Sequence, residues 1–509
     1  MSKPVYVANL DTIVTGIMPG VNEEHIPLWI TAKDVVMEAA GVRPAPGLTT
    51  PYVDNGYFDD QAGLFDDYAG LFDEAGTRVL LLALDDQAIK GIHVQKQSDG
   101  RLLVVWGTDE ALFTFNGLVV TDASRPSPYS GTSAASDIVE TTQWSFAQWG
   151  DWVLATNGAD APQVLKYGTA TEFADISGFP AATAQIVRVL GPHALFFNCS
   201  GTWTPGPSPA AMNQIIFCAE DDVEEYDPSA NVTAGELTIR DFPGPILAVE
   251  HLGGELIAYG ESSCHVIRYG GQFLITAQKG AQGIRPAGKN AVASVGSRHI
   301  LLSQNGLFST DGISIQPAAY PALGAWMETV VDWNQRSRIA HVVDVRHAQI
   351  SWCLPGINDD IVLTYNWLTD KLTTLGRTFT AGTRVESLWR PLIGYFNGEI
   401  KMLVDEPADR SPELVTKPLL VGGRTTHTFL DMFVTRWSGE DATLQVKYAE
   451  RQNDLDTTPW ETVGPISGKE SLQYLMRETM FCQFRLTSPG RKWVLSGIEL
   501  LGTAGGGRL

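Results

Sequence analysis

The sequence predicts an all-β protein, with a β-propeller of about six blades followed by a C-terminal β-sandwich domain and few short helices. Three observations lead to this fold class. Charged residues make up 18% of the 509 residues, against roughly 25% in an average soluble domain. Glycine supplies 50 residues, which favours a chain with many tight turns. The third observation is a hairpin-like segment that recurs along the chain.

The recurrence is visible in two pairs of segments. Residues 109–117 and 304–312 both read x-x-[Ala/Gly]-Leu-Phe-[Thr/Ser]-x-[Asn/Asp]-Gly, a strand that ends in a turn dipeptide. Residues 164–168 (Val-Leu-Lys-Tyr-Gly) resemble residues 266–270 (Val-Ile-Arg-Tyr-Gly), and each segment follows strand-like residues after a glycine-containing turn. Both pairs are typical of repeated β-hairpins.

The apolar centres of the outer strands recur at intervals of about 50 residues, which is roughly the length of one four-stranded blade. One small sheet cannot cover both of its faces, so such sheets pack face to face around an axis and close into a ring. The alternative is a pair of ordinary β-sandwiches that happen to have similar turns. The centres are Phe113, Leu165, Phe217, Ile267, Phe308 and Thr364.

Changes in composition divide the chain into four parts. Residues 1–77 are expected to form an N-terminal arm, with residues before 50 supplying a strand that latches the last blade, and residues 78–405 are expected to form the propeller. The segment 406–412 lies in an acidic, proline-containing run and is expected to be a linker. Residues 413–509 alternate apolar and polar positions at period 2, which predicts the β-sandwich.

A tandem seven-residue repeat occupies residues 58–76, where Phe58, Phe65 and Phe72 each precede a pair of carboxylates. So many carboxylates suggest calcium, but they lack the alternate-position spacing of an EF-hand loop. We favour a solvated loop or extended arm that uses the phenylalanines as anchors, and calcium binding stays open.

Helix is expected in few places. Residues 321–336 space Leu323, Trp326 and Val330 at helical intervals, with a proline in the first turn. Residues 31–41 could form a short helix, although Val35 and Val36 suit a strand equally well.

Charge and composition exclude several functions. The longest apolar run, residues 79–84, is far shorter than the ~20 residues of a membrane helix, so no membrane insertion is expected. No secretory signal is recognisable, which predicts synthesis in the cytoplasm. The formal net charge is −22 with scattered basic residues, which argues against tight nucleic-acid binding. The five cysteines form no Cys-x-x-Cys pair and are expected to be buried free thiols.

Motifs for catalysis are mostly missing. Gly260-Glu-Ser-Ser-Cys264 lacks the second glycine of a nucleophile elbow. Cys264 and His265 are adjacent on an expected strand, so they point to opposite faces and are interpreted as an interior cysteine and a surface histidine. Trp203 could stack on a sugar or simply pack in its loop, and carboxylate pairs for sugar hydrolysis cannot be recognised by sequence alone. We therefore predict no catalytic, cofactor-binding or metal-binding residue.

One acidic run, residues 220–227, stands out. Its side chains Asp221, Asp222, Glu224 and Glu225 repel one another and any polyanion. The run is interpreted either as a solvated hairpin tip or as a wall that prevents DNA from adhering, because like charge opposes the counterion release that drives DNA binding. These four carboxylates are the candidate site residues.

The repeated segments resemble a known family. Residues 300–312 (Ile-Leu-Leu-Ser-Gln-Asn-Gly-Leu-Phe-Ser-Thr-Asp-Gly), the expected helix after them, and residues 350–356 and 361–366 look like the propeller of tail nozzle proteins of short-tailed bacteriophages (podoviruses). The ending, residues 481–486 and 493–499, is similar as well. The resemblance covers residues 100–500 and its motifs are structural.

Membership would imply a structural virion protein without enzymatic activity. It would form a homo-hexamer below the portal and the head-to-tail adaptor, contact a tail fibre or needle, retain double-stranded DNA before infection and conduct it as weakly held cargo during ejection. Its location would be the virion, after assembly in the host cytoplasm. The alternatives are a propeller enzyme that degrades polysaccharide, with its site on the axis, and a carbohydrate-binding or assembly propeller from a cell.

Overall fold

A computed structural model gives the structure of the protein. The described residues form one nearly continuous stretch in the middle of the chain, with shorter stretches toward both ends. They are residues 5–9, 29–33, 35–38, 41–44, 46–49, 81–82, 87–116, 119–130, 143–180, 182–201, 212–242, 244–270, 275–319, 323–375, 378–384, 391–407, 413–416, 418–421, 428–439, 441–467, 470–488 and 493–504.

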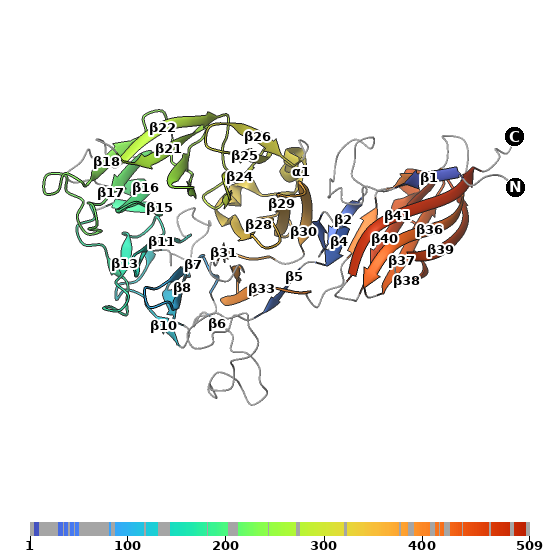
Figure 1. Cartoon of the computed structure of the whole chain (residues 1–509), viewed down its shortest axis with the longest axis horizontal. Helices are drawn as coiled ribbons and strands as arrows, with labels where there is room; N and C mark the ends of the chain where they lie inside the picture. The colour runs from blue at the N-terminus through green and yellow to red at the C-terminus, as the bar shows by residue number, and fades with distance from the viewer. Residues whose placement is uncertain are drawn as a thin grey trace. The chain divides into compact units, whose positions relative to one another are not determined.

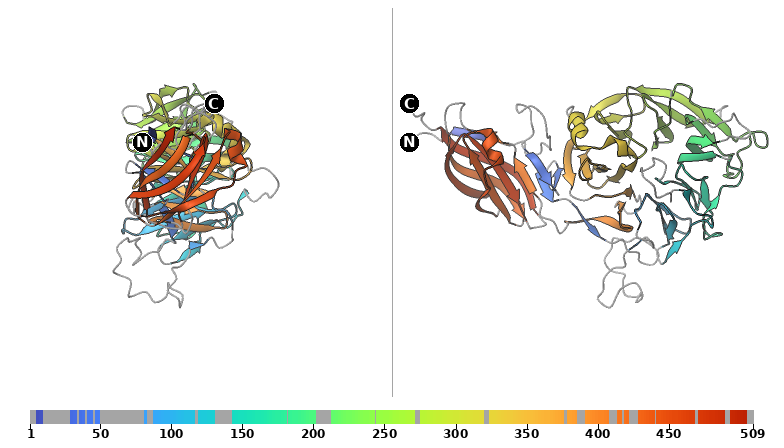
Figure 2. Two further views of the ribbon diagram at one scale, coloured as in Figure 1. Left: turned by 90° about the vertical axis from the view of Figure 1, so that its right-hand side faces the viewer. Right: turned by 180° about the vertical axis from the view of Figure 1, so that it is seen from behind.

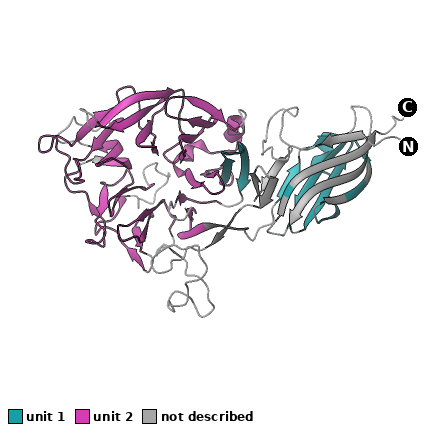
Figure 3. Ribbon diagram, viewed as in Figure 1, with its two compact units in different colours: residues 1–48, 361–377, 404–509 teal, residues 49–360, 378–403 magenta. Residues whose placement is uncertain are grey.

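The chain divides into two compact units (Figure 3). Unit 1 combines three segments: residues 1–48, 361–377 and 404–509. Unit 2 consists of residues 49–360 and 378–403. Unit 1 therefore contains both ends of the chain as well as a short segment from its middle.

Unit 2 is built from small antiparallel sheets. Within the described residues, five sheets of four strands follow one another along the chain, and in each the strands pair in chain order. They are β7 (Gly91–Lys96), β8 (Leu102–Gly107), β9 (Leu112–Phe115) and β10 (Val120–Asp122); β11 (Ser145–Trp149), β12 (Trp152–Thr156), β13 (Gln163–Leu165) and β14 (Ala174–Asp175); β15 (Ala182–Leu190), β16 (His193–Gly201), β17 (Gln214–Phe217) and β18 (Gly235–Thr238); β19 (Ala248–Leu252), β20 (Glu255–Tyr259), β21 (Ser263–Tyr269) and β22 (Ile275–Gln282); and β23 (Val292–Val295), β24 (Arg298–Ser303), β25 (Gly306–Thr310) and β26 (Ile315–Ala318).

Two further groups of strands complete the described part of unit 2. β27 (Ala340–Asp344) pairs with β28 (Gln349–Leu354). β31 (Ala381–Thr383) pairs with β32 (Leu392–Gly394), which pairs with β33 (Glu399–Pro407). The last strand also pairs with β6 (Leu81–Leu82), so a segment from far earlier in the chain joins this sheet.

The first strand of each group contacts the first strand of the next. These contacts run from β7 through β11, β15, β19, β23 and β27 to β31, and β31 contacts β7. Figure 1 shows the sheets of unit 2 following one another around a circle. The described residues thus contain seven such first strands, one more than the spacing of apolar centres in the sequence predicted.

Close approach of the first strands requires glycine at Gly382. A Cβ atom there would lie 2.5 Å from the carbonyl oxygen of His341 on the neighbouring strand β27. We expect Gly382→Ala to destabilise unit 2 by about 1–3 kcal/mol, because the backbone must shift to accommodate the methyl group. Gly254→Ala is the control, since a Cβ atom at Gly254 meets nothing within 4 Å. Equal midpoints of thermal unfolding for the two variants would contradict the expectation.

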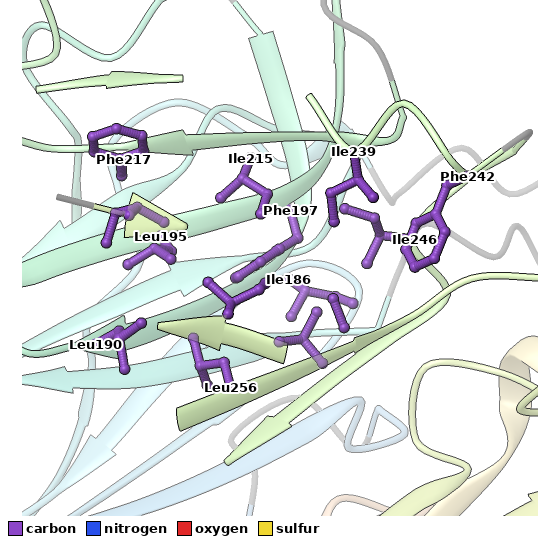
Figure 4. Close-up of a cluster of buried hydrophobic side chains, with 14 residues drawn as sticks. Ile186, Leu190, Leu195, Phe197, Ile215, Phe217, Ile239, Phe242, Ile246 and Leu256 are labelled. Carbon is purple, nitrogen blue, oxygen red and sulfur yellow. The ribbon is translucent and has the colours of Figure 1, made fainter. Parts of the chain in front are cut away.

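Apolar side chains fill the space between neighbouring sheets. The cluster between β15–β18 and β19–β22 contains Leu195, Phe197 and Leu256, all fully buried, and Figure 4 shows side chains from both sheets meeting there. Similar clusters lie on either side of this one along the chain. At about 25 cal/mol for each Å² of apolar surface removed from water, these clusters are the main source of stability in unit 2.

Unit 1 contains the longest strands of the described chain, β36, β39 and β41, which run side by side (Figure 2). One group of strands pairs in the order β3-β4-β41-β36-β39, with β1 also paired to β41. A second group pairs in the order β30-β2-β34-β40-β37-β38, with β35 paired to β40 and β29 paired to β30. The strands are β1 (Val5–Asn9), β2 (Trp29–Lys33), β3 (Val35–Glu38), β4 (Gly41–Pro44), β29 (Ile361–Asn366), β30 (Lys371–Leu375), β34 (Glu413–Thr416), β35 (Leu419–Leu420), β36 (Thr428–Gly439), β37 (Ala442–Ala449), β38 (Glu461–Ile466), β39 (Glu470–Thr479), β40 (Phe481–Thr487) and β41 (Trp493–Ala504).

Both ends of the chain meet in unit 1. β1 and β4 from the N-terminal segment pair with β41 near the C-terminus. β2 pairs antiparallel to β34 and parallel to β30. The described residues of the segment 31–41, which suited a helix or a strand, are in strands β2 to β4.

The predicted helix is confirmed but is shorter than expected. α1 covers Leu323–Val330, and a 3-10 helix, η3 (Trp333–Arg338), follows it with Asp332 as N-cap. A second 3-10 helix, η4, covers Gln452–Asp456. The five cysteines are buried free thiols, as predicted. Among the described residues, no helix has the length and hydropathy of a membrane span, and the repeat 58–76 and Trp203 lie outside the described residues.

Candidate functional site

The four candidate channel-lining carboxylates lie on one turn, in the connection between β17 and β18. Asp221 and Asp222 are exposed, and Glu224 and Glu225 are partly buried. The backbone of this acidic turn is hydrogen-bonded: the Ala219 N–H donates to the Glu225 carbonyl at 2.8 Å, and the Asp221 N–H donates to the Pro192 carbonyl at 3.0 Å.

Two apolar side chains anchor the acidic turn. Val223 and Tyr226 are almost fully buried in the cluster between β11–β14 and β15–β18. The Tyr226 ring meets Phe179 edge-on with centroids 5.1 Å apart, and burial raises the pKa of its hydroxyl well above the usual value. The alternation of buried and exposed positions within residues 220–227 therefore holds the carboxylates in fixed places.

Only one of the four carboxylates has a cationic partner among the ion pairs of the described residues. Glu224 Oε2 lies 2.6 Å from Lys166 Nζ, which comes from the neighbouring sheet. The side chain of Asp222 accepts a hydrogen bond from the Glu224 N–H at 3.0 Å, and that of Glu225 accepts one from the Asp227 N–H at 2.7 Å. The turn is consequently an exposed and strongly negative feature on a rigid support.

A second candidate site, which sequence reasoning missed, is a cavity of about 400 Å³ inside unit 2. Residues on the first strands of the small sheets line it, with the turn before β23 supplying Lys289 and Asn290. Among the described residues, the lining contains four cationic side chains, Lys90, Arg188, Lys289 and Arg384, and one carboxylate, Glu250.

Arg188 on β15 and Glu250 on β19 form a mostly buried ion pair, with 17% and 21% of their side chains exposed. Arg188 Nη1 also donates to Ser145 Oγ on β11 at 3.0 Å, so this residue links three neighbouring strands. Burial alone would raise the pKa of Glu250, but Arg188 and His341 hold it below its usual value. Glu250 is therefore ionised and neutralises Arg188.

Lys289 has no carboxylate partner in the part of the chain that the structure describes. Its Nζ donates to the Gln143 carbonyl at 2.6 Å, and the neighbouring Asn290 donates from Nδ2 to the Gln143 side chain at 2.8 Å. Burial, together with the charge of Arg188, lowers the pKa of Lys289 well below its usual value. The amine thus lies in a place where its positive charge is poorly compensated.

Histidines surround these charged groups. Burial and the charge of Arg188 lower the pKa of His93 to about 4, against a weaker opposing effect of its hydrogen bond to Gln95. Burial likewise lowers the pKa of His341, whose Nδ1 has no hydrogen-bond partner. Both histidines line the cavity, and burial there favours the neutral form of each imidazole.

The shift of His93 predicts acid sensitivity. Because the folded pKa is about 4 and the unfolded value is about 6.5, the stabilisation is complete above pH 6.5 and is lost as the pH falls toward 4. We expect the free energy of unfolding to decrease over that interval, and to decrease less in His93→Gln. Urea unfolding at a series of pH values measures this, and equal pH dependence in the two proteins would contradict it.

One sequence-based interpretation of a histidine is wrong. His265 was expected at the surface, but it is only 4% exposed and packs against Phe242 with ring centroids 4.7 Å apart; β21 is covered on both faces, so alternation does not bring this side chain to solvent. His341 lies in the cavity, whereas His347 forms an ion pair with Asp344 at 2.6 Å.

The described residues contain no group of three or more side chains suited to hold a metal ion. Burial raises the pKa of Cys218 and Cys353 to about 12, which keeps these thiols protonated and unreactive. No family model matches the chain, and no curated protein sequence matches it.

Proposed function

We propose that this protein is a structural tail nozzle protein of a short-tailed bacteriophage, which retains DNA before infection and conducts it during ejection. The proposal starts from the sequence resemblance in residues 100–500. Its support in the structure is coarse: the described chain is almost entirely β, and its unit 2 consists of successive small antiparallel sheets.

The finer fold that we propose is a β-propeller in unit 2 and a β-sandwich in unit 1. The cyclic contacts of the first strands, from β7 through to β31 and back to β7, support the propeller. Pairing of β33 with β6 from earlier in the chain would then help to hold the ring closed. The two groups of long strands in unit 1 support the sandwich.

The observation that carries the proposed function is the acidic turn. A channel that conducts DNA must not bind the DNA tightly. Tight binding requires cationic side chains that contact phosphates and release counterions, and exposed carboxylates on a hydrogen-bonded turn offer no such contacts. Asp221 and Asp222 are exposed on a turn anchored by buried Val223 and Tyr226. With a formal charge of −22 per chain, a ring of such chains would repel DNA along its path.

Assembly is part of the proposal. The nozzle is a homo-hexamer in the virion, attached to the portal through the adaptor and in contact with a tail fibre or needle, with double-stranded DNA as weakly held cargo. The chain is made in the host cytoplasm and acts without catalysis or a cofactor.

Quantitative mass spectrometry of purified virions tests the proposal. The copies of this chain are counted against those of the portal protein, and about half the portal count is expected for a six-fold ring below a twelve-fold one. Absence of the chain from virions would overturn the proposal.

A second function is favoured by one observation, the cavity of unit 2. A polysaccharide-degrading enzyme or carbohydrate-binding protein would place its ligand there, among Arg188, Glu250 and Lys289. Release of reducing ends from host capsule by the purified protein would support the enzyme and count against a purely structural role.

A further inference from the structure

The cavity of unit 2 differs in charge from the rest of the protein. The chain as a whole carries −22, yet the cavity is lined by four cationic side chains and one carboxylate. A concentration of positive side chains in a cavity destabilises the folded protein unless negative groups lie nearby. The reason is that like charges repel strongly in a medium of low dielectric constant.

Two of the cationic groups pair with carboxylates of the described residues. Arg188 is neutralised by Glu250, and Lys90 Nζ lies 3.4 Å from Asp109. Lys289 is left with a backbone carbonyl as its hydrogen-bond acceptor, and Arg384 is exposed at the same cavity. Among the described residues no carboxylate faces Lys289, and an anion in the cavity would favour the protonated form of its amine.

The size and surroundings of the cavity suit a small molecule. Its volume of about 400 Å³ lies in the range of sites for small ligands, roughly 300–1,000 Å³. Ser145, Asn290 and Thr383 add polar groups to the lining, and Ile92 and Val189 add apolar surface. These groups lie on or next to the first strands of several sheets. The contacts between those strands therefore hold the site in place, rather than one loop.

We propose that this cavity binds a small organic anion, a carboxylate or a phosphate on a molecule of monosaccharide size, with Lys289 and Arg384 as its cationic contacts. The proposal is independent of the nozzle function, because it concerns the interior of a single chain. Charge-assisted hydrogen bonds from the two cations would fix the anionic group. The nearby His93 and His341 could take up protons as the anion arrives.

Isothermal titration calorimetry of the full-length protein tests the proposal. The probes are glucuronate and glucose 6-phosphate, with glucose as the uncharged control. We expect at least one of the two anions to bind with a millimolar or lower Kd, and glucose to bind at least about tenfold more weakly. Binding of glucuronate alone identifies a carboxylate site, and binding of glucose 6-phosphate alone identifies a phosphate site.

Substitutions locate the binding. Lys289→Gln and Arg384→Gln are each expected to weaken binding of the anion about tenfold or more. Lys279→Gln is the matched control, since Lys279 lies in unit 2 on β22, outside the cavity, 3.6 Å from Asp241. Arg384 is exposed, so its substitution remains informative if Lys289→Gln fails to fold. Failure of both anions to bind, equal binding of glucose, or equal weakening by Lys279→Gln would overturn the proposal.

Discussion

Phe197→Ala is expected to lower the free energy of unfolding of unit 2 by about 3–5 kcal/mol, the usual cost of removing a buried aromatic ring. Phe197 is fully buried on β16, in the cluster that joins β15–β18 to β19–β22. The loss combines the transfer free energy of the ring with a cavity between two sheets that are held in place by their own hydrogen bonds. Neighbouring Leu195 and Leu256 then lose packing partners.

Urea unfolding of the full chain measures this effect, and hydrogen exchange of peptides from β15 to β22 locates it. Phe396→Ala is the control, because Phe396 is 47% exposed, with the guanidinium carbon of Arg338 lying 5.7 Å from its ring centroid. The control should change stability by about 1 kcal/mol or less. Similar unfolding midpoints for both variants would show that the cluster does not hold the two sheets together.

The repeat in unit 2 could be predicted because its strongest signal comes from one kind of strand. Five of the six apolar centres in the sequence, from Phe113 to Phe308, lie on strands that are third in a sheet of four: β9, β13, β17, β21 and β25. The sixth centre, Thr364, lies on β29, which belongs to unit 1. Strands β9, β13 and β17 are buried at every position, which makes them continuous apolar runs. The strands β31 to β33 contain no such apolar centre. The spacing of apolar centres in the sequence therefore did not reveal this last group of strands.

The cavity could not be predicted, because its residues are scattered over the whole of unit 2. Arg188 and Glu250 are 62 residues apart, and each looks like an ordinary charged residue at a strand position. Only the ring of contacts between first strands brings them together. The first strands also lack the apolar pattern that marks the third strands, since they line a polar space.

The sequence also did not predict which segments of the chain form unit 1. Alternation at period 2 in residues 413–509 predicted strands there, and strands are found. Pairing of β41 with β1 and β4 joins the two ends of the chain, and neither partner's sequence specifies such a long-range pairing. Alternation identifies a strand and its buried face, but it does not identify the neighbouring strand.

The acidic turn is the part of the candidate site that the sequence did reveal, because a run of carboxylates is visible without knowledge of the fold. The structure adds its anchors, Val223 and Tyr226, and its one ion pair, Lys166 with Glu224. Substitution at the carboxylates can therefore change the charge while leaving the apolar anchors in place.

Reversing the charge of the acidic turn is expected to slow DNA ejection by about tenfold or more, because each lysine offers the phosphate backbone a contact that releases counterions. The variant carries Asp221→Lys, Asp222→Lys, Glu224→Lys and Glu225→Lys together. Single-particle ejection rates and infectivity measure the effect. High salt should restore part of the rate, since it weakens phosphate contacts and would not repair a folding defect.

A neutral variant separates charge from structure. Asp221→Asn, Asp222→Asn, Glu224→Gln and Glu225→Gln retain the shape of the side chains and their capacity to accept hydrogen bonds at Asp222 and Glu225. This variant should eject DNA at a rate between those of the wild type and the lysine variant, whereas structural damage at the turn would make both variants equally slow at every salt concentration. Virions that contain the lysine variant in normal copy number and eject at the normal rate would reject the placement of this turn along the path of DNA, because four added cations beside a passing polyanion must retard it.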